Sequence, residues 1–146
     1  MNGFSLWKLF TGDVVTAIAS IVLVVFSVMS WAIIVEKIRL FHAARRNEPT
    51  GNPDEAIKPF DKNLWFLSMV AYVSPFIGLF GTVWGVMDSF ASIGANQSVS
   101  IGVIAPGLAI ALGTTALGLI VAIPAAIAHQ VFTKRADYLY EKLGEK

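Results

Sequence analysis

Between Lys62 and Lys134 the sequence contains a single charged residue, Asp88, and this interval holds two of the chain's three long apolar runs. Soluble domains carry about 25% charged residues, whereas this chain has 14%, together with 55% hydrophobic residues. Each apolar run reaches the roughly 20 residues that a helix needs to cross about 30 Å of hydrocarbon. The sequence therefore predicts an all-α integral membrane protein with three transmembrane helices.

The limits of the segments follow from the places where charged residues, glycine and proline interrupt the apolar runs. We expect a periplasmic amphipathic lead-in at 1–13, transmembrane helices at 14–35, 64–93 and 101–132, a cytoplasmic connector at 36–63, a periplasmic turn at 94–100 and a cytoplasmic tail at 133–146. The second and third helices are longer than the hydrocarbon requires. The short turn between them predicts an antiparallel hairpin.

Three local features add detail to this plan. Pro75 is expected to kink the second helix. The middle of the connector, residues 47–59, contains two proline-flanked turns and predicts a loop. Glu36 and Lys37 are interpreted as a solvated pair at the end of the first helix.

Basic residues predict how the chain is oriented in the membrane. Of the eleven Lys and Arg residues, six lie at 36–63, four lie at 133–146 and none lies at 94–100. Cytoplasmic loops carry an excess of Lys and Arg. We therefore expect the connector and the C-terminus to be cytoplasmic and the N-terminus to be periplasmic.

The second apolar run carries small residues at helical spacing. Gly81 and Gly85 form a G-x-x-x-G pair, a pattern that lets two helix backbones approach closely in a membrane. The opposite face carries Phe80 and Trp84, which suit lipid or a neighbouring helix. A wider stripe of small or weakly polar side chains follows one helix face: Gly78, Thr82, Gly85 and Ser89.

The third run carries a matching stripe, which consists of Gly107, Ala111, Thr115, Gly118, Ala122 and Ala125. Counted from the turn, Thr82 lies about 18 Å and Thr115 about 22 Å along its helix, so both hydroxyls are expected near mid-membrane. A hydroxyl in hydrocarbon needs a partner, which is either the carbonyl four residues back or a group across the helix pair. The two stripes either pack together or line a cavity, with Thr114 as a neighbour of that cavity or a part of its lining.

Three stretches of the sequence resemble the TolQ/ExbB proton-channel family, which is distantly related to MotA. They are PFIGLFGTVWGVM at 75–87, APGLA at 105–109 and TALGLIVAIPA at 115–125. Two further stretches, SWAIIVEK at 30–37 and SLWKLF at 5–10, are more similar to TolQ than to ExbB. The resemblance covers nearly the whole chain.

This resemblance implies a homopentameric ring in the bacterial inner membrane, with single-span TolR- or ExbD-type helices in its pore. An aspartate of the partner helix would take up the proton, and Thr82 and Thr115 match the family's pore threonines. The implied function is that of a proton-channel or motor subunit of a Tol-Pal type complex, which passes motion to a TolA- or TonB-type envelope protein and supports outer-membrane constriction at cell division. An ExbB-type role in TonB-dependent transport, or a non-conducting scaffold for partner helices, is the alternative.

The chain departs from the family pattern at two places. Ile110 stands where the family usually carries a glutamate in the third span, and the connector at 36–63 is much shorter than the family's. Asp88, near the outer end of the second span, is interpreted as an interfacial residue or as a possible pore mouth.

Other classes of function find little support in the sequence. A net charge of +1 gives no case for nucleic acid, and the absence of cysteine excludes thiolate chemistry. His42 and His129 flank the predicted spans instead of sharing a face, so we expect no metal and no cofactor, with protons as the coupling ion. The spans hold no Ser/His/Asp set and no paired carboxylates, so we do not expect an enzyme.

Overall fold

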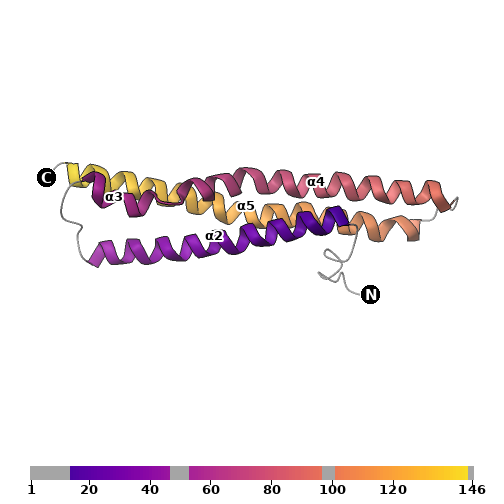
Figure 1. The fold of residues 1–146 in the computed structure, drawn as a ribbon, viewed down its shortest axis with the longest axis horizontal. Coiled ribbons are helices and arrows are strands. Elements are labelled where there is room, and N and C mark those ends of the chain that lie inside the picture. Colours follow the sequence, from indigo (N-terminus) through magenta and orange to yellow (C-terminus); the bar gives the residue numbers. More distant parts are fainter. Residues whose placement is uncertain (1–13, 47–52, 97–100, 145–146) are drawn as a thin grey trace.

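The computed structural model describes residues 14–46, 53–96 and 101–144, and these form four helices. Their bounds are α2 Val14–Arg46, α3 Pro53–Asp61, α4 Leu64–Asn96 and α5 Ile101–Gly144 (Figure 1). The expected lead-in at 1–13, residues 47–52 of the connector and residues 97–100 of the expected turn lie outside the described residues. Within the described part, three segments are long and apolar enough to cross a membrane: Val14–Ala43, Lys58–Ser92 and Ile104–Lys142.

All three long helices extend beyond the limits expected from the apolar runs. α2 continues to Arg46 instead of ending at residue 35, and α4 continues to Asn96. The third span and the expected tail form one helix, α5, of 44 residues. Hydropathy locates the part of a helix that suits lipid, whereas a helix ends at glycine, proline or a cap. Residues 36–46 and 133–143 contain neither glycine nor proline, so the helices run on.

The connector contains a short helix, α3, where the sequence analysis expected a loop. Pro53 occupies the first helical position, which suits proline because that amide needs no helical partner. Glu55 follows in the first turn, where an acidic residue is favourable. Asn63, with a φ of 65°, separates α3 from α4, in the left-handed region that asparagine tolerates better than most residues. The proline-flanked segment is therefore partly helical.

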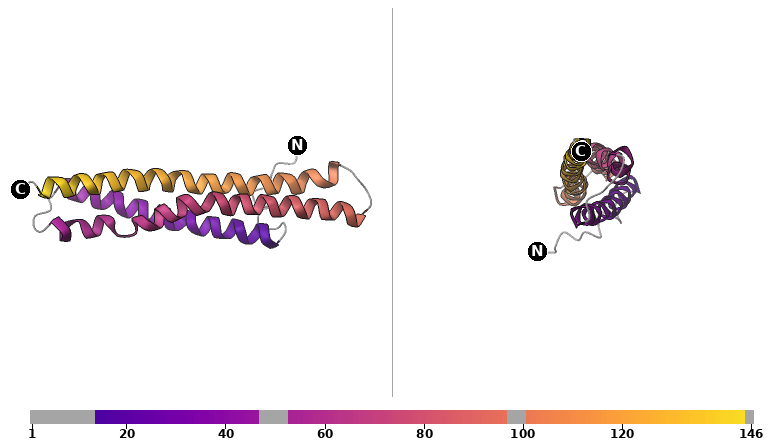
Figure 2. Two further views of the ribbon diagram at one scale, coloured as in Figure 1. Left: turned by 90° about the horizontal axis from the view of Figure 1, so that it is seen from above. Right: turned by 90° about the vertical axis from the view of Figure 1, so that its left-hand side faces the viewer.

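α4 and α5 lie side by side and run in opposite directions, and α2 packs along both (Figure 2). The register is fixed by close contacts, with Gly118 of α5 next to Ser74 of α4 and Gly107 next to Ser89. α4 continues as a helix through Pro75. α3 lies at the same end of the bundle as the C-terminal part of α5 (Figure 1).

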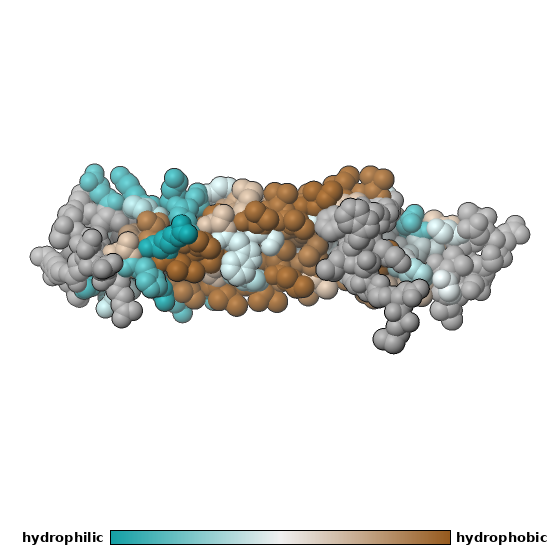
Figure 3. All heavy atoms as spheres, turned by 90° about the horizontal axis from the view of Figure 1, so that it is seen from below, coloured by the Kyte–Doolittle hydropathy of each residue, from teal (hydrophilic) through white to brown (hydrophobic). Residues whose placement is uncertain are grey.

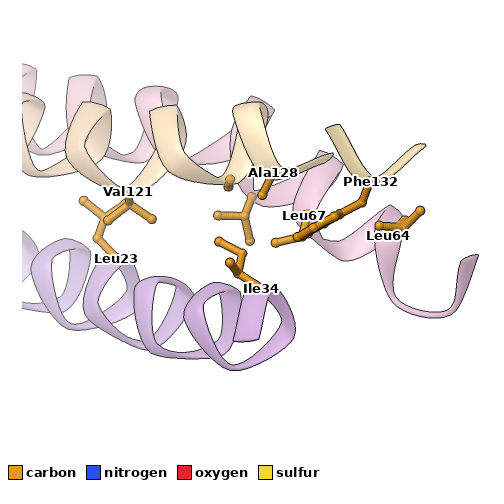
Figure 4. Close-up of a cluster of buried hydrophobic side chains, with 9 residues drawn as sticks. Leu23, Ile34, Leu64, Leu67, Val121, Ala128 and Phe132 are labelled. Carbon is orange, nitrogen blue, oxygen red and sulfur yellow. The ribbon is translucent and has the colours of Figure 1, made fainter. Parts of the chain in front are cut away.

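The apolar core lies between the three long helices and toward the end that carries α3. Leu23 and Ile34 of α2 face Val121 and Ala128 of α5, and Leu67 of α4 completes the contact (Figure 4). Leu64, Val70, Ala125 and Phe132 belong to the same buried cluster.

The outer surface of the bundle is apolar over its middle and charged at the end that carries α3 (Figure 3). Large apolar side chains point outward from each long helix, for example Trp31, Phe76 and Ile120, which are 57%, 70% and 67% exposed. A soluble monomer rarely exposes contiguous apolar surface of this extent. The surface therefore suits the hydrocarbon of a bilayer.

Candidate functional site

The backbones of α4 and α5 come closest where two glycines face each other. A Cβ atom built on Gly118 would lie 2.7 Å from Ser74 O, and one built on Gly78 would lie 2.8 Å from Thr114 O. These distances are too short for any side chain, and the backbone atoms that they involve cannot give way. Both positions therefore require glycine, and the two glycines bring carbonyl groups of one helix against the other.

The remaining packing glycines extend this contact in both directions. A Cβ atom on Gly81 would lie 2.8 Å from Thr114 Oγ1, and one on Gly85 would lie 2.8 Å from Ala111 Cβ and 3.7 Å from Thr16 Oγ1 of α2. Gly107 faces the hydroxyl of Ser89. The small-residue stripes thus meet each other within one chain. The face that carries the G-x-x-x-G pair is therefore occupied by α5 of the same chain.

Thr82 and Thr115, expected at equal depth, are in contact through their hydroxyl groups. The Thr82 hydroxyl also lies 2.8 Å from Ala111 O across the helix pair and 3.2 Å from Gly78 O of its own helix. The Thr115 hydroxyl lies 3.2 Å from Gly78 O. Both partners that the sequence left open for Thr82, its own helix carbonyl and a group across the pair, are therefore within reach.

Thr114 completes the cluster from a more buried position. Its side chain is fully buried, and its hydroxyl lies 2.7 Å from Ala111 O and 3.2 Å from Gly78 O. Thr82 and Thr115 are only half-buried. The three hydroxyls, with the carbonyls of Gly78 and Ala111, form what we call the threonine cluster. Thr114 lies on the buried side of this cluster, and Thr82 and Thr115 lie toward the surface of the helix pair.

Two other residues singled out from the sequence lie near the cluster but outside it. Asp88 is exposed and lies about 9 Å along α4 from Thr82, counted by helical rise, and its carbonyl accepts a hydrogen bond of 3.0 Å from the Ser92 hydroxyl. Ile110, where the resemblance in the sequence leads us to expect a glutamate, is half-buried one helical turn before Thr114. The cluster therefore contains hydroxyls and carbonyls, and no side-chain carboxylate of this chain.

The sequence analysis did not single out two buried hydroxyls on α2. Thr16 and Ser20 are 1% and 0% exposed, and the Ser20 hydroxyl donates to Thr16 O at 2.9 Å. Thr16 also lies beside Gly85, so α2 adds a hydroxyl to the half of the α4–α5 contact that lies farther from α3. The available signal was a pair of hydroxyl residues four positions apart in an otherwise apolar run, which places both on one helix face.

Lys37 is the largest fully buried side chain among the described residues, which corrects its interpretation as part of a solvated pair. Its ammonium donates a hydrogen bond of 2.7 Å to Pro59 O near the C-terminal end of α3. The nearby ring of Phe41 lies 4.8 Å from that of Phe60 in α3 and 5.7 Å from that of Phe132 in α5. The spacing of Lys37 from the buried residue Ile34 and from Phe41 could have indicated an inward position, because the three share one helix face.

Among the described residues, no group of three or more His, Cys, Asp and Glu side chains is placed to hold a metal ion. In the threonine cluster the structure gathers hydroxyls and backbone carbonyls. A hydroxyl both donates and accepts hydrogen bonds, and a carbonyl accepts them. The chemistry that these groups support is hydrogen bonding and proton exchange.

Three membrane-length helices packed around a mid-span hydroxyl cluster define a polytopic helical membrane protein. A model of the MotA/TolQ/ExbB proton channel family matches residues 50–145, and the chain belongs to this family. The resemblance seen in the motifs is thereby confirmed. The matched region includes α3, α4 and α5, and therefore the whole threonine cluster.

Curated relatives carry the names of both branches of the family. The biopolymer transport protein ExbB of Salmonella typhimurium is 44% identical over 80 residues, which are 55% of this chain and 33% of that protein. The Tol-Pal system protein TolQ of Pseudomonas aeruginosa is 47% identical over 79 residues, 54% of this chain and 34% of that protein. The match with this chain thus spans about a third of the length of these two relatives.

A third relative matches along nearly its whole length. The biopolymer transport protein ExbB of Helicobacter pylori is 34% identical over 142 residues, which are 97% of this chain and 96% of that protein. The family therefore includes another member whose length is close to that of this chain, so the short connector between α2 and α4 has a counterpart.

Proposed function

We propose that the chain is a subunit of a proton-driven channel or motor in the bacterial inner membrane, assembled as a homopentameric ring around TolR- or ExbD-type partner helices. The observation that carries this proposal is the hydroxyl pair of Thr82 and Thr115, half-buried in the middle of two apolar helices. Membership of a proton channel family supports it. The bilayer and other copies of this chain cover the exposed apolar faces of the helices.

The threonine cluster suits the recognition of a carboxyl group that changes its protonation state. A hydroxyl both donates and accepts a hydrogen bond, so it binds a neutral carboxyl as well as a carboxylate. The cluster has no carboxylate of its own, and Asp88 is the only acidic residue between Lys62 and Lys134. The carboxyl group is therefore proposed to come from the partner helix. The membrane potential contributes about 2.3 kcal/mol per proton per 100 mV.

Valine and serine substitutions at Thr82 and Thr115 test this proposal. Valine keeps the branched shape of threonine and removes the hydroxyl, whereas serine keeps the hydroxyl. In vesicles that contain the chain with its co-expressed partner, we expect proton flux to fall about tenfold or more in Thr82→Val and Thr115→Val, which corresponds to about 1.4 kcal/mol. The serine variants should retain most of the flux. Full flux in both valine variants, with normal assembly, would make the hydroxyls packing atoms only.

Two branches of the family compete for the biological role. The motifs at 5–10 and 30–37 favour a Tol-Pal type role in outer-membrane constriction at division, while the match along nearly the whole Helicobacter pylori ExbB favours energising TonB-dependent transport. Complementation separates them. Rescue of detergent sensitivity in cells that lack TolQ supports the first role, and rescue of iron-siderophore uptake in cells that lack ExbB supports the second.

A non-conducting scaffold for partner helices is the second candidate function, and the observation that favours it is Ile110. The position lies one turn from Thr114 and carries an apolar, β-branched side chain where the family usually carries a glutamate. If the cluster conducts protons, Ile110→Glu should keep or raise proton flux, because the site already contains polar groups. A scaffold predicts no flux for the unchanged chain with its partner, and none after this substitution.

A further inference from the structure

The hydroxyl pair of Thr82 and Thr115 shares its backbone acceptors with Thr114. The Thr114 hydroxyl lies 2.7 Å from Ala111 O and 3.2 Å from Gly78 O. The Thr82 hydroxyl reaches the same two carbonyls, at 2.8 Å and 3.2 Å. The Thr115 hydroxyl reaches Gly78 O at 3.2 Å. The Thr82 and Thr114 hydroxyls also lie 3.5 Å from each other, the longest contact in the cluster. Three hydroxyl protons therefore compete for two carbonyl oxygens, for the bond between Thr82 and Thr115 and for this longer contact.

Apart from the longer contact between Thr82 and Thr114, the number of protons equals the number of acceptor positions. A carbonyl oxygen has two lone pairs, and within a helix one of them receives the amide four residues further along. Gly78 O and Ala111 O each lie inside a continuous helix, so each has room for one hydroxyl proton. The third proton lies between Thr82 and Thr115. With all three threonines present, every position is filled.

The direction of the Thr82–Thr115 bond depends on Thr114. When Thr114 donates to Gly78 O, only Thr82 remains within reach of Ala111 O, so Thr115 must donate to Thr82. When Thr114 donates to Ala111 O, Gly78 O accepts from either of the others, and Thr82 is able to donate to Thr115. These arrangements differ only in the rotation of O–H bonds, so no heavy atom has to move.

We propose that Thr114 is a positioning residue that sets the direction of the hydrogen bond between Thr82 and Thr115. The donor of that bond keeps its oxygen lone pairs free. When Thr114 donates to Gly78 O, Thr115 is the half-buried hydroxyl that is left to accept a proton-bearing group, such as a protonated carboxyl of a partner helix. When Thr114 donates to Ala111 O, the opposite direction becomes available and Thr82 is able to take that role. This inference rests on the proposed function, in which Thr82 and Thr115 face the partner.

A packing role for Thr114 makes the opposite prediction for two substitutions. Thr114 is fully buried, so if only its volume matters, Thr114→Val should behave like the unchanged chain and Thr114→Ser should be worse because it loses a methyl group. If the hydroxyl matters, serine should preserve the cluster and valine should disrupt it. The order of the two variants therefore distinguishes the two roles.

The test uses the full chain in lipid bilayers, with threonine side chains labelled for NMR detection of their hydroxyl protons. In Thr114→Val, one carbonyl position stays empty, so the remaining hydroxyls change partner and admit water. We expect exchange of the Thr82 and Thr115 hydroxyl protons with deuterated water to be about fivefold faster or more, with shifted signals. In Thr114→Ser both signals should stay close to those of the unchanged chain.

Unchanged Thr82 and Thr115 signals in Thr114→Val, or equal disturbance in the serine and valine variants, would overturn the inference. If Thr114→Val does not fold, Thr114→Ala replaces it, since alanine also lacks the hydroxyl. These readouts need no partner and no proton flux. NMR signals that contradict the role of Thr114 would leave the proposed function standing. Full proton flux in the Thr82→Val and Thr115→Val variants would contradict the proposed function, whatever the NMR signals show.

Discussion

Lys37 of α2 places its ammonium 2.7 Å from the carbonyl oxygen of Pro59, near the C-terminal end of α3. Asn63, four residues after Pro59, leaves the helical region with a φ of 65°, so the Lys37 ammonium takes the position of the missing helix amide. A cation at this end of a helix is favourable because unpaired carbonyls and the helix dipole make it negative. Lys37 thus acts as a C-cap supplied by a different helix.

Replacement of Lys37 should release α3 from α2. Lys37→Met keeps most of the side-chain volume but leaves Pro59 O without its donor. We expect the free energy of unfolding to fall by about 1.5–3 kcal/mol, the range for hydrogen bonds to charged groups, and amide hydrogen exchange in α3 to become faster. Arg39→Met is the control, since Arg39 is exposed on the same helix. Unchanged exchange in α3 would contradict the capping role.

Gly81 leaves room for the side chain of Thr114, and this predicts a coupled effect. In Gly81→Ala the new Cβ would lie 2.8 Å from Thr114 Oγ1. The side chain of Thr114 would have to move, although it is β-branched and fully buried. We expect Gly81→Ala to lower the thermal unfolding midpoint in the unchanged chain. The loss should be smaller in a Thr114→Ala background, which removes that oxygen. A double-mutant cycle measures the coupling, and strictly additive effects would contradict the contact.

Leucine at the closest glycines should prevent α4 and α5 from packing. A leucine at Gly118 or Gly85 would overlap with Ser74 O or with Ala111. We expect these variants to lose the α4–α5 contact itself, and ring formation only as a result. Ala116→Leu is the control because Ala116 is exposed on α5. The measurement is thermal unfolding of the purified chain in detergent, beside native mass spectrometry. A normal unfolding midpoint with a lost ring would place these glycines at a subunit interface instead.

The proposed orientation predicts which exposed positions are accessible from each side of the membrane. The chain has no native cysteine, so single cysteines report without interference. Gly102→Cys at the start of α5 should react with a membrane-impermeant maleimide added to intact spheroplasts. Lys58→Cys in α3 should react only after the inner membrane is permeabilised. The reverse pattern would overturn the orientation inferred from the basic residues.

The equal depth of Thr82 and Thr115 was predictable because helical rise is constant and the connection between the two apolar runs is short. The glycine contacts were predictable for a related reason, since small residues at helical spacing mark a face that a second helix approaches closely. Periodicity does not fix how far α5 is rotated about its axis. The rotation of α5 places Thr114 beside Thr115 in the contact with α4. The angle of this rotation could not be obtained from one sequence.

The hydrogen-bond partner of Lys37 could not be predicted from the sequence, for a different reason. Its partner carbonyl lies 22 residues away in the chain, in a helix of nine residues. A helix of that length is marginal in isolation and depends on tertiary packing. The acids and proline at its start were visible, but the docking that makes it stable required the arrangement of α2 and α5 around it. The extension of α2 beyond the apolar run, in contrast, was visible in the sequence, because residues 36–46 contain neither glycine nor proline.

The unbroken length of α5 has a mechanical consequence. Helix α5 continues from Thr115 to Gly144 without interruption, a lever arm of about 43 Å at 1.5 Å per residue. If the helix pivots at the threonine cluster, a tilt of about 5° moves its far end by about 4 Å, on the length given by helical rise. Because α3 packs against α5 at that end, a sub-ångström adjustment around the hydroxyls is magnified into a displacement of the charged end of the bundle.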